Sequence, residues 1–258
     1  MRWQAVLLGV ALLATTATKA TIATTTSATD PAHRLMASIN QARAARGLVP
    51  LRSDPRLWAI AGERAGRLAA SGVLTHDAAG PLAQDLAARG VPWFSYGEVI
   101  GVASGSAGLA EGTILGLWSA SSEHWPLLMS ERYNYLGVGF AYRASSGATL
   151  ASVVLTESPD RTGARAAVAP PSVSGNDVRW SWRGWDVPLQ TYTAGLRDFM
   201  VQLRMDRGTW VTIGSGPAST TKAMLNLVRG HWYGLRVRAR DWAGNTGPWS
   251  SERRVWLP

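Results

Sequence analysis

The spacing of apolar residues changes partway along this 258-residue chain, and that change constrains the fold more than any other feature. Before about residue 130, apolar side chains recur every three or four residues, which is the period of a helix packed on one face. From Leu136 onward they alternate, which is the period of a strand. Helices followed by strands predict an α+β protein, with one mixed α and β unit and one unit made only of strands.

Two Asp-Pro pairs mark the expected helix starts, at Asp30-Pro31 and Asp54-Pro55. An aspartate before a helix accepts hydrogen bonds from its free N–H groups, and proline fits the first turn. We expect these helices to end near Gly47 and Gly72, because glycine is favoured just past a helix. Further helices are expected over 82–89, 109–118 and 121–129.

Two neighbouring strands, 136–142 and 150–156, are expected to form a hairpin packed against these helices. The stretch 158–176 is rich in Pro, Ala, Ser, Gly and Arg without an apolar period, which predicts a linker. Short alternating segments then predict a β-sandwich. They lie around 178–182, 199–205, 210–213, 225–227, 233–239 and 255–257.

The predicted division is therefore a signal peptide and flexible lead at 1–28, a mixed domain at 30–157, the linker at 158–176 and a β-sandwich at 177–258. Arg2 precedes an apolar run from Ala5 to Ala14, which is typical of a signal peptide and shorter than the roughly 20 residues of a spanning helix. We expect a protein that is secreted or associated with the cell envelope. No later segment is apolar enough to predict an integral membrane protein.

Composition excludes several classes of function. The absence of cysteine excludes disulfides, thiolate metal sites and a cysteine nucleophile. The net charge of +9 is concentrated in residues 170–258, which carry 12 basic and 6 acidic residues. A basic half favours association with anionic envelope polymers, and no motif predicts specific nucleic-acid recognition.

His76, Glu98 and His124 are the candidate chemical groups. Two imidazoles and a carboxylate from separate elements can hold a divalent cation such as zinc, or move a proton near neutral pH. Two imidazoles alone would hold the cation weakly, and Glu98 is then a possible general base for a bound water. The alternative is that all three are surface residues that cap helices and bond locally.

These candidates lie within a series of short motifs. The series is Ile39-Asn40-Gln41-Ala42-Arg43, Gly47-Leu48-Val49-Pro50-Leu51, Thr75-His76, Gly97-Glu98-Val99-Ile100, Trp118, Ser121-Ser122-Glu123-His124 and Leu136-Gly137-Val138-Gly139-Phe140. In this order the motifs resemble the CAP superfamily of cysteine-rich secretory, antigen-5 and pathogenesis-related proteins, in its bacterial SCP-like form, over residues 33–157. The resemblance implies a three-layer α-β-α sandwich and a surface cleft where the histidines and Glu98 converge, holding zinc or another divalent cation in some members. Val99 replaces the usual asparagine, and a second cleft glutamate after Trp118 is missing.

The C-terminal segment resembles an immunoglobulin-like fibronectin type III module over residues 171–258, through its alternating strand at 233–239 and the turn that follows. On that strand Arg236, Arg238 and Arg240 should share the outer face. They can bind acidic polymers, or they can simply keep a sheet face solvated. Three tryptophans in turn-like contexts can stack on sugars, although a scaffold role is the alternative. These are Trp185, Trp242 and Trp249.

The leading hypothesis is an exported, non-enzymatic binding or interaction module whose cleft takes a small or lipid-like ligand, with a divalent cation on His76 and His124. A metal-dependent hydrolase of peptide, ester or cell-wall substrates, with Glu98 as base, is the alternative. A wall-polysaccharide adhesin is the third.

Overall fold

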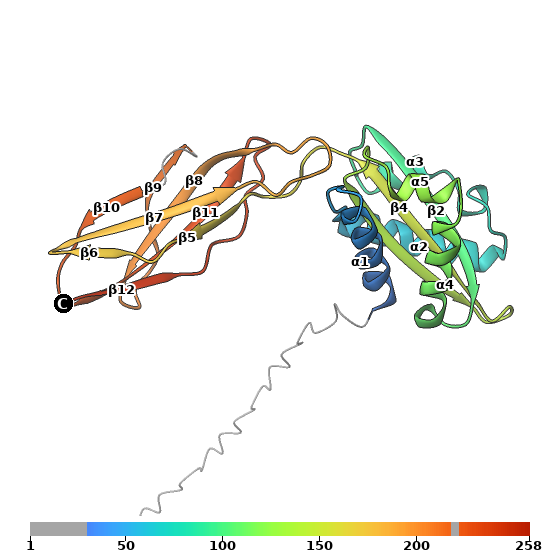
Figure 1. The fold of residues 1–258 in the computed structure, drawn as a ribbon, viewed down its shortest axis with the longest axis horizontal. Helices are drawn as coiled ribbons and strands as arrows, with labels where there is room; N and C mark the ends of the chain where they lie inside the picture. Colours follow the sequence, from blue (N-terminus) through green and yellow to red (C-terminus); the bar gives the residue numbers. More distant parts are fainter. Residues whose placement is uncertain (1–29, 218–221) are drawn as a thin grey trace, which may run out of the picture.

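The computed structural model describes residues 30–217 and 222–258, so the predicted signal peptide lies outside the described residues. Figure 1 shows the helices gathered at one end of the molecule and a strands-only unit at the other. We call the part from α1 to β4 the first domain and the part from β5 to β12 the second domain. Within the described residues, no helix is both long and apolar enough to cross a membrane.

The first domain is a four-stranded sheet in the order β1-β3-β4-β2, antiparallel except where β1 runs parallel to β3. Helices cover both of its faces, as an α-β-α sandwich requires. Its elements are α1 (Pro31–Ala44), β1 (Arg52–Ser53), α2 (Pro55–Ser71), the 3-10 turn η1 (Asp77–Ala79), α3 (Leu82–Ala88), β2 (Ser95–Ser104), α4 (Ala107–Ser119), α5 (His124–Leu128), β3 (Tyr135–Arg143) and β4 (Ala148–Glu157).

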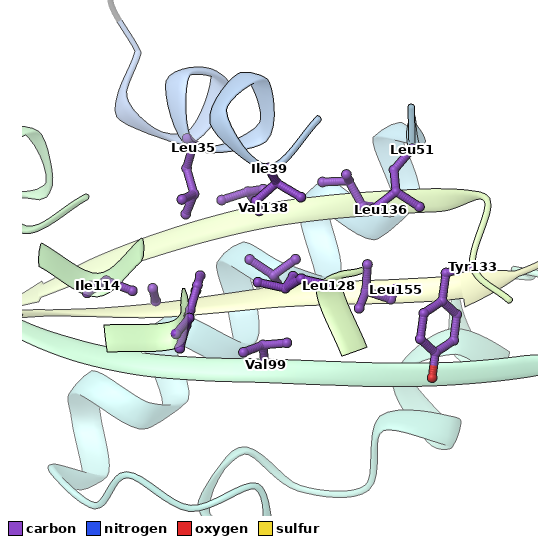
Figure 2. Close-up of a cluster of buried hydrophobic side chains, with 14 of the residues drawn as sticks. Leu35, Ile39, Leu51, Val99, Ile114, Leu128, Tyr133, Leu136, Val138 and Leu155 are labelled. Carbon is purple, nitrogen blue, oxygen red and sulfur yellow. The ribbon is translucent and has the colours of Figure 1, made fainter. Parts of the chain in front are cut away.

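One face of the sheet packs against α1, α4 and α5, through a core in which Ile39 and Leu128 meet Val99 and Val138 (Figure 2). The other face packs against α2 and α3. Neighbouring residues along a strand point to opposite faces. Val99 therefore lies on the α5 side of β2, and Glu98 lies on the α2 side.

The predicted helix starts are confirmed. Asp30 accepts a hydrogen bond from the amide of Ala32, and Asp54 accepts one from the amide of Arg56. Helix α2 also ends as predicted at Gly72, whose φ of 70° is left-handed. Helix α1 ends at Ala44, three residues before Gly47, because its last turn closes on Ala45 while the chain is still right-handed.

Helix α2 lies directly on β3, at Gly137 and Gly139. A Cβ atom on Gly137 would stand 2.1 Å from the carbonyl carbon of Leu57, and one on Gly139 would stand 2.3 Å from that of Ala61. These glycines alternate with Leu136 and Val138, which fill the core on the opposite face. The Leu-Gly-Val-Gly sequence therefore makes one face of β3 apolar and leaves the other face bare for the helix backbone.

The second domain contains two sheet faces around a core of its own. The strand orders are β10-β7-β5, with β6 also paired to β7, and β12-β11-β8-β9. Trp180 and Trp182 are buried in this core with Phe199. The strands are β5 (Arg165–Val168), β6 (Ser172–Ser174), β7 (Asp177–Trp185), β8 (Leu196–Met205), β9 (Val211–Pro217), β10 (Lys222–Asn226), β11 (His231–Asp241) and β12 (Arg253–Leu257).

The stretch expected to be a linker, 158–176, differs from expectation because it contains β5 and β6. Strand β5 pairs with the end of β7, with Val168 opposite Trp182. Backbone hydrogen bonds to a long neighbouring strand hold this segment, which has too few apolar residues to show a period.

The two domains also contact each other through the loop between β7 and β8. Leu189 of this loop is buried beside Leu57 of the first domain. The side-chain oxygen of Gln190 accepts a hydrogen bond from the amide of Val49 at 2.7 Å, and Asn134 donates to the carbonyl of Thr191 at 3.2 Å. The contact therefore combines a shared apolar core with polar bonds at its rim.

Gly137→Ala tests the contact between α2 and β3. The added methyl group would overlap helix backbone that cannot move alone, so we expect a loss of at least about 2 kcal/mol of unfolding free energy in urea. Gly112→Ala is the matched control, because its Cβ would meet nothing within 4 Å on exposed α4. We expect that control to gain up to about 1 kcal/mol from helix propensity. Equal effects of the two substitutions would contradict the close packing.

Candidate functional site

A buried ion pair between Arg64 of α2 and Glu98 of β2 forms the centre of the candidate site. The two planar groups face each other with two parallel bonds, Nε to Oε1 at 2.6 Å and Nη2 to Oε2 at 2.7 Å. The hydroxyl of Ser152 donates to Oε1 at 2.7 Å, and Nδ1 of His76 lies 2.8 Å from Oε2. Each carboxylate oxygen of Glu98 thus has two partners.

Arg64 also holds the turn that carries His76. Its Nη1 donates to the carbonyl of Gly80 at 2.9 Å and to Oδ2 of Asp85 at 2.7 Å, and its Nη2 lies 3.4 Å from the carbonyl of His76. A single guanidinium therefore joins helix α2, strand β2, the η1 turn and helix α3. Its planar fork of donors suits this role better than the point charge of a lysine.

The environment of Glu98 keeps its carboxylate charged. Burial raises the pKa of Glu98, but hydrogen bonds from Arg64, His76 and Ser152 outweigh burial and hold it below its usual range. The same contacts with Glu98 and Asp85 outweigh burial in the opposite sense and raise the pKa of Arg64. At neutral pH the pair is therefore fully ionised, and Glu98 is a weak base.

His76 has one ring nitrogen committed and one open. An ionised carboxylate only accepts hydrogen bonds, so Nδ1 of His76 carries the proton toward Glu98. The Nε2 atom then has no partner among the described residues, and 55% of the His76 side chain is exposed. Beside it lies a hollow of about 340 Å³, lined by Arg64, His76, Asp77, Gly80, Pro81, Leu82, Tyr96, Gly97 and Glu98.

Among the described residues, His124 forms no hydrogen bond or ion pair with Arg64 or Glu98. It begins α5, and Leu128 of that helix packs in the core on the opposite face of the sheet from Glu98. Its Nδ1 lies 2.8 Å from the hydroxyl of Ser121, and it does not line the hollow beside His76. Among the described residues, His76, Glu98 and His124 do not form a set with ligand atoms within 4.8 Å of one another.

The sequence reasoning missed Arg64, although a signal was present. Arg64 is placed on the same apolar stripe of α2 as Leu57, Ile60 and Leu68. A charged residue at a buried helical position needs a buried partner. That rule would have pointed to Arg64 and to a carboxylate on the sheet beneath it.

The three arginines of β11 share the outer face of their strand, as predicted, because Val237 and Ala239 between them are buried. They are largely occupied by neighbours. Arg236 and Arg238 stack on the ring of Trp249, at 4.5 and 4.7 Å from its centroid. Arg240 forms an ion pair with Asp198 at 2.7 Å.

The three candidate tryptophans of the second domain differ in exposure. Trp249 is half-buried between two arginines, which gives it a scaffold role. Trp185 and Trp242 are 44% and 68% exposed, so their rings can meet a ligand. Trp185 and Trp242 are therefore the more exposed of the three candidate rings.

Three carboxylates meet where the domains join, at Asp160, Asp186 and Asp241, with oxygens within 4.8 Å of one another. Each accepts hydrogen bonds from nearby N–H groups, such as those of Thr162 and Gly195. Burial, together with the charges of Asp160 and Asp241, raises the pKa of Asp186. The sequence did not predict this cluster, because its three residues lie far apart along the chain. The hydrogen bonds that these carboxylates accept fix turns at the junction.

The family comparison covers the part of the chain that contains all three candidate groups. Residues 36–156 match the model described as CAP, the cysteine-rich secretory protein family. These residues form a CAP domain. The Arg64 and Glu98 pair, the His76 hollow and His124 all lie inside it, whereas the second domain lies beyond the match.

Among solved structures, a cysteine-rich secretory protein from Staphylococcus aureus is 22% identical, with 49% of this chain and 38% of that one covered and a TM-score of 0.41. An extracellular protein containing an SCP domain from Bacillus anthracis is 20% identical, with 49% and 40% covered and a TM-score of 0.41. An outer surface protein from Borrelia burgdorferi is 16% identical, with 50% and 92% covered and a TM-score of 0.45. The chain spans about two fifths of the first two proteins. No curated protein matches the sequence.

Glu98→Gln tests the buried pair. Removing the charge leaves the buried Arg64 with only Asp85, which is partly exposed, as a countercharge, so we expect a loss of about 3 kcal/mol of unfolding free energy at pH 7. Because the folded-state pKa of Glu98 is lowered, its stabilisation is complete above the unfolded pKa of about 4.3 and is lost as pH falls through the folded pKa. Urea unfolding of both proteins from pH 7 to pH 2 should show the difference shrinking below about pH 4.

The matched control is Glu63→Gln, on the exposed side of α2 and paired with Arg89. We expect a change below about 0.5 kcal/mol at pH 7, since exposed pairs contribute little. A similarly small change for Glu98→Gln would contradict the importance of the buried pair.

Proposed function

We propose that this protein is an exported binding module, whose CAP domain takes a small or lipid-like ligand in the hollow beside His76 without breaking its bonds. The observation that supports this most is that hydrogen bonds already occupy both carboxylate oxygens of Glu98. A general base needs a free lone pair and a pKa near the working pH. Glu98 has two partners on each oxygen and a lowered pKa, so it is better suited to positioning His76 than to accepting a proton.

A hydrolase is the second candidate, and the contact between His76 and Glu98 is the observation that favours it. A carboxylate that holds one imidazole nitrogen orients the ring and makes the other nitrogen more basic. In this version the base is Nε2 of His76, and the role of Glu98 is to hold the ring. Among the described residues, no serine is hydrogen-bonded to His76, so water would be the nucleophile.

We also propose that any divalent cation, such as zinc, is held through ring nitrogens of His76 and His124. The support is chemical, because imidazole is a good zinc ligand and both rings belong to the CAP domain. The oxygens of Glu98 are already occupied, so they add no strong ligand. Two imidazoles without a carboxylate leave the cation mostly hydrated, which is why we expect weak binding.

We further propose that the protein acts outside the cell and that its second domain, of the fibronectin type III kind, attaches it to the envelope. The apolar run at Ala5 to Ala14 supports export. The basic charge of residues 170–258 supports attachment to anionic polymers. Attachment to polysaccharide would instead use the exposed rings of Trp185 and Trp242.

Zinc calorimetry tests the cation. We expect a weak binding heat for the unmodified protein, and no heat above the dilution blank for His76→Ala or His124→Ala. His33→Ala is the matched control, since His33 is also partly exposed and pairs with an aspartate, Asp30. Equal heats for all four proteins would refute the proposed ligands.

A substrate assay separates the binding module from the hydrolase. The purified protein, with and without zinc, is incubated with nitrophenyl esters, unstructured peptides and cell-wall material. We expect no release of product above the blank, because the carboxylate next to the hollow is already fully bonded. Turnover that His76→Gln abolishes and His33→Gln retains would replace the binding module with the hydrolase.

A further inference from the structure

A groove of about 770 Å³ lies along the junction between the two domains. One wall comes from the CAP domain, from Met36 and Asn40 of α1 and the stretch from Pro50 to Arg56. The other wall comes from the connection that leads into β5 and from the loop after β11. This groove shares no residue with the hollow beside His76.

The second wall is held in a fixed position by backbone contacts. A Cβ on Gly163 would stand 2.5 Å from the carbonyl carbon of Thr246, and one on Gly247 would stand 1.8 Å from the carbonyl oxygen of Ala164. Backbones this close leave little room for movement between the two segments. The residue that follows in β5, Arg165, therefore starts from a fixed position at the edge of the groove.

The groove has an excess of positive charge. Four arginines line it, at positions 52, 56, 161 and 165, with a single carboxylate, Asp54. Asp54 is shared, because Arg56 and Arg161 both bond to its Oδ2, at 3.0 and 2.7 Å. The lining thus carries a net charge of +3, and its one carboxylate, Asp54, already pairs with two arginines.

The other two arginines form no ion pair with Asp54 and have unused donors, as does Arg161, whose Nε is buried without a partner. Arg52 donates from Nη2 to the carbonyl of Pro188 at 3.1 Å, while its Nε is buried without a partner. Arg165 is exposed, and no hydrogen bond or ion pair reaches its guanidinium within the part of the chain that the structure describes. Burial lowers the pKa of Arg52, and repulsion from the charge of Arg165 adds to this. An anion between them would relieve both costs.

We propose that this groove binds a phosphate group, with Arg52 and Arg165 as its ligands from opposite walls. Phosphate fits better than a carboxylate, whose two oxygens point the same way and suit one fork of donors. The oxygens of phosphate point in several directions, so arginines on two walls can bond to it at once. A phosphate monoester also carries about 1.5 to 2 negative charges at pH 7, close to the excess in the groove.

The groove is a better anion site than the outer face of β11. There, Arg240 pairs with Asp198, and Arg236 bonds to Gln202 and stacks on Trp249. Among the residues that the structure describes, Arg165 has no such partners. This inference does not depend on the proposed function of the His76 hollow, since either site can exist without the other.

Calorimetry of the purified protein with inorganic phosphate in low-salt buffer tests the proposal. We expect Arg52→Gln/Arg165→Gln to weaken phosphate binding at least about tenfold, because two charge-assisted contacts are removed. The control is Arg207→Gln/Arg229→Gln, which removes the same charge from exposed positions outside the groove. We expect that control to change the affinity less than about twofold, because distant exposed charges are screened.

The single variant Arg165→Gln should fold normally, because the Arg165 side chain is exposed. We expect it to weaken phosphate binding at least about threefold. The absence of phosphate binding by the unmodified protein would overturn the proposal, as would equal weakening by the groove and control variants.

Two further probes distinguish the source of the phosphate. Binding of glycerol phosphate without binding of phosphatidylglycerol vesicles supports a soluble or polymeric phosphate. Vesicle binding that is lost only in the groove variants supports a lipid headgroup.

Discussion

The buried pair of Arg64 and Glu98 is the interaction on which the candidate site depends. Neither charge is stable in the interior alone, and two parallel hydrogen bonds join the two groups. Because Arg64 also binds the carbonyls of the η1 turn, the pair fixes the backbone that presents His76. The site is thus one connected polar network between helix and sheet, in which the exposed imidazole is the terminal group and the carboxylate is internal.

This arrangement changes how the Gly-Glu sequence of β2 should be interpreted. A glutamate between two histidines in sequence suggests a ligand or a base, and residue spacing alone gives no information about what already occupies its oxygens. In the fold, Glu98 faces Arg64 across the gap between sheet and helix, and its pKa falls. The oxygens of Glu98 are occupied by Arg64 and His76, while His124 begins α5, whose Leu128 packs on the other face of the sheet.

Much of the fold followed from local signals. Asp30 and Asp54 indicated the helix starts, and the alternation over 178–182 indicated the strand β7, because caps and alternation are properties of neighbouring residues. What could not be predicted depends on residues far apart in sequence. The pairing of β5 with β7, the partner of Arg64 and the carboxylate cluster at Asp160 all arise from tertiary contacts that leave no local pattern.

The loop that carries Leu189 has a consequence for how the molecule divides. Leu189 covers part of the apolar surface of Leu57. One residue of the CAP domain's core therefore comes from the loop between β7 and β8, more than thirty residues after the end of β4. A fragment that stopped at Glu157 would leave this apolar surface open to water and to other copies of itself. The residues that bury the apolar surface of the CAP domain therefore extend past the residues that match the family.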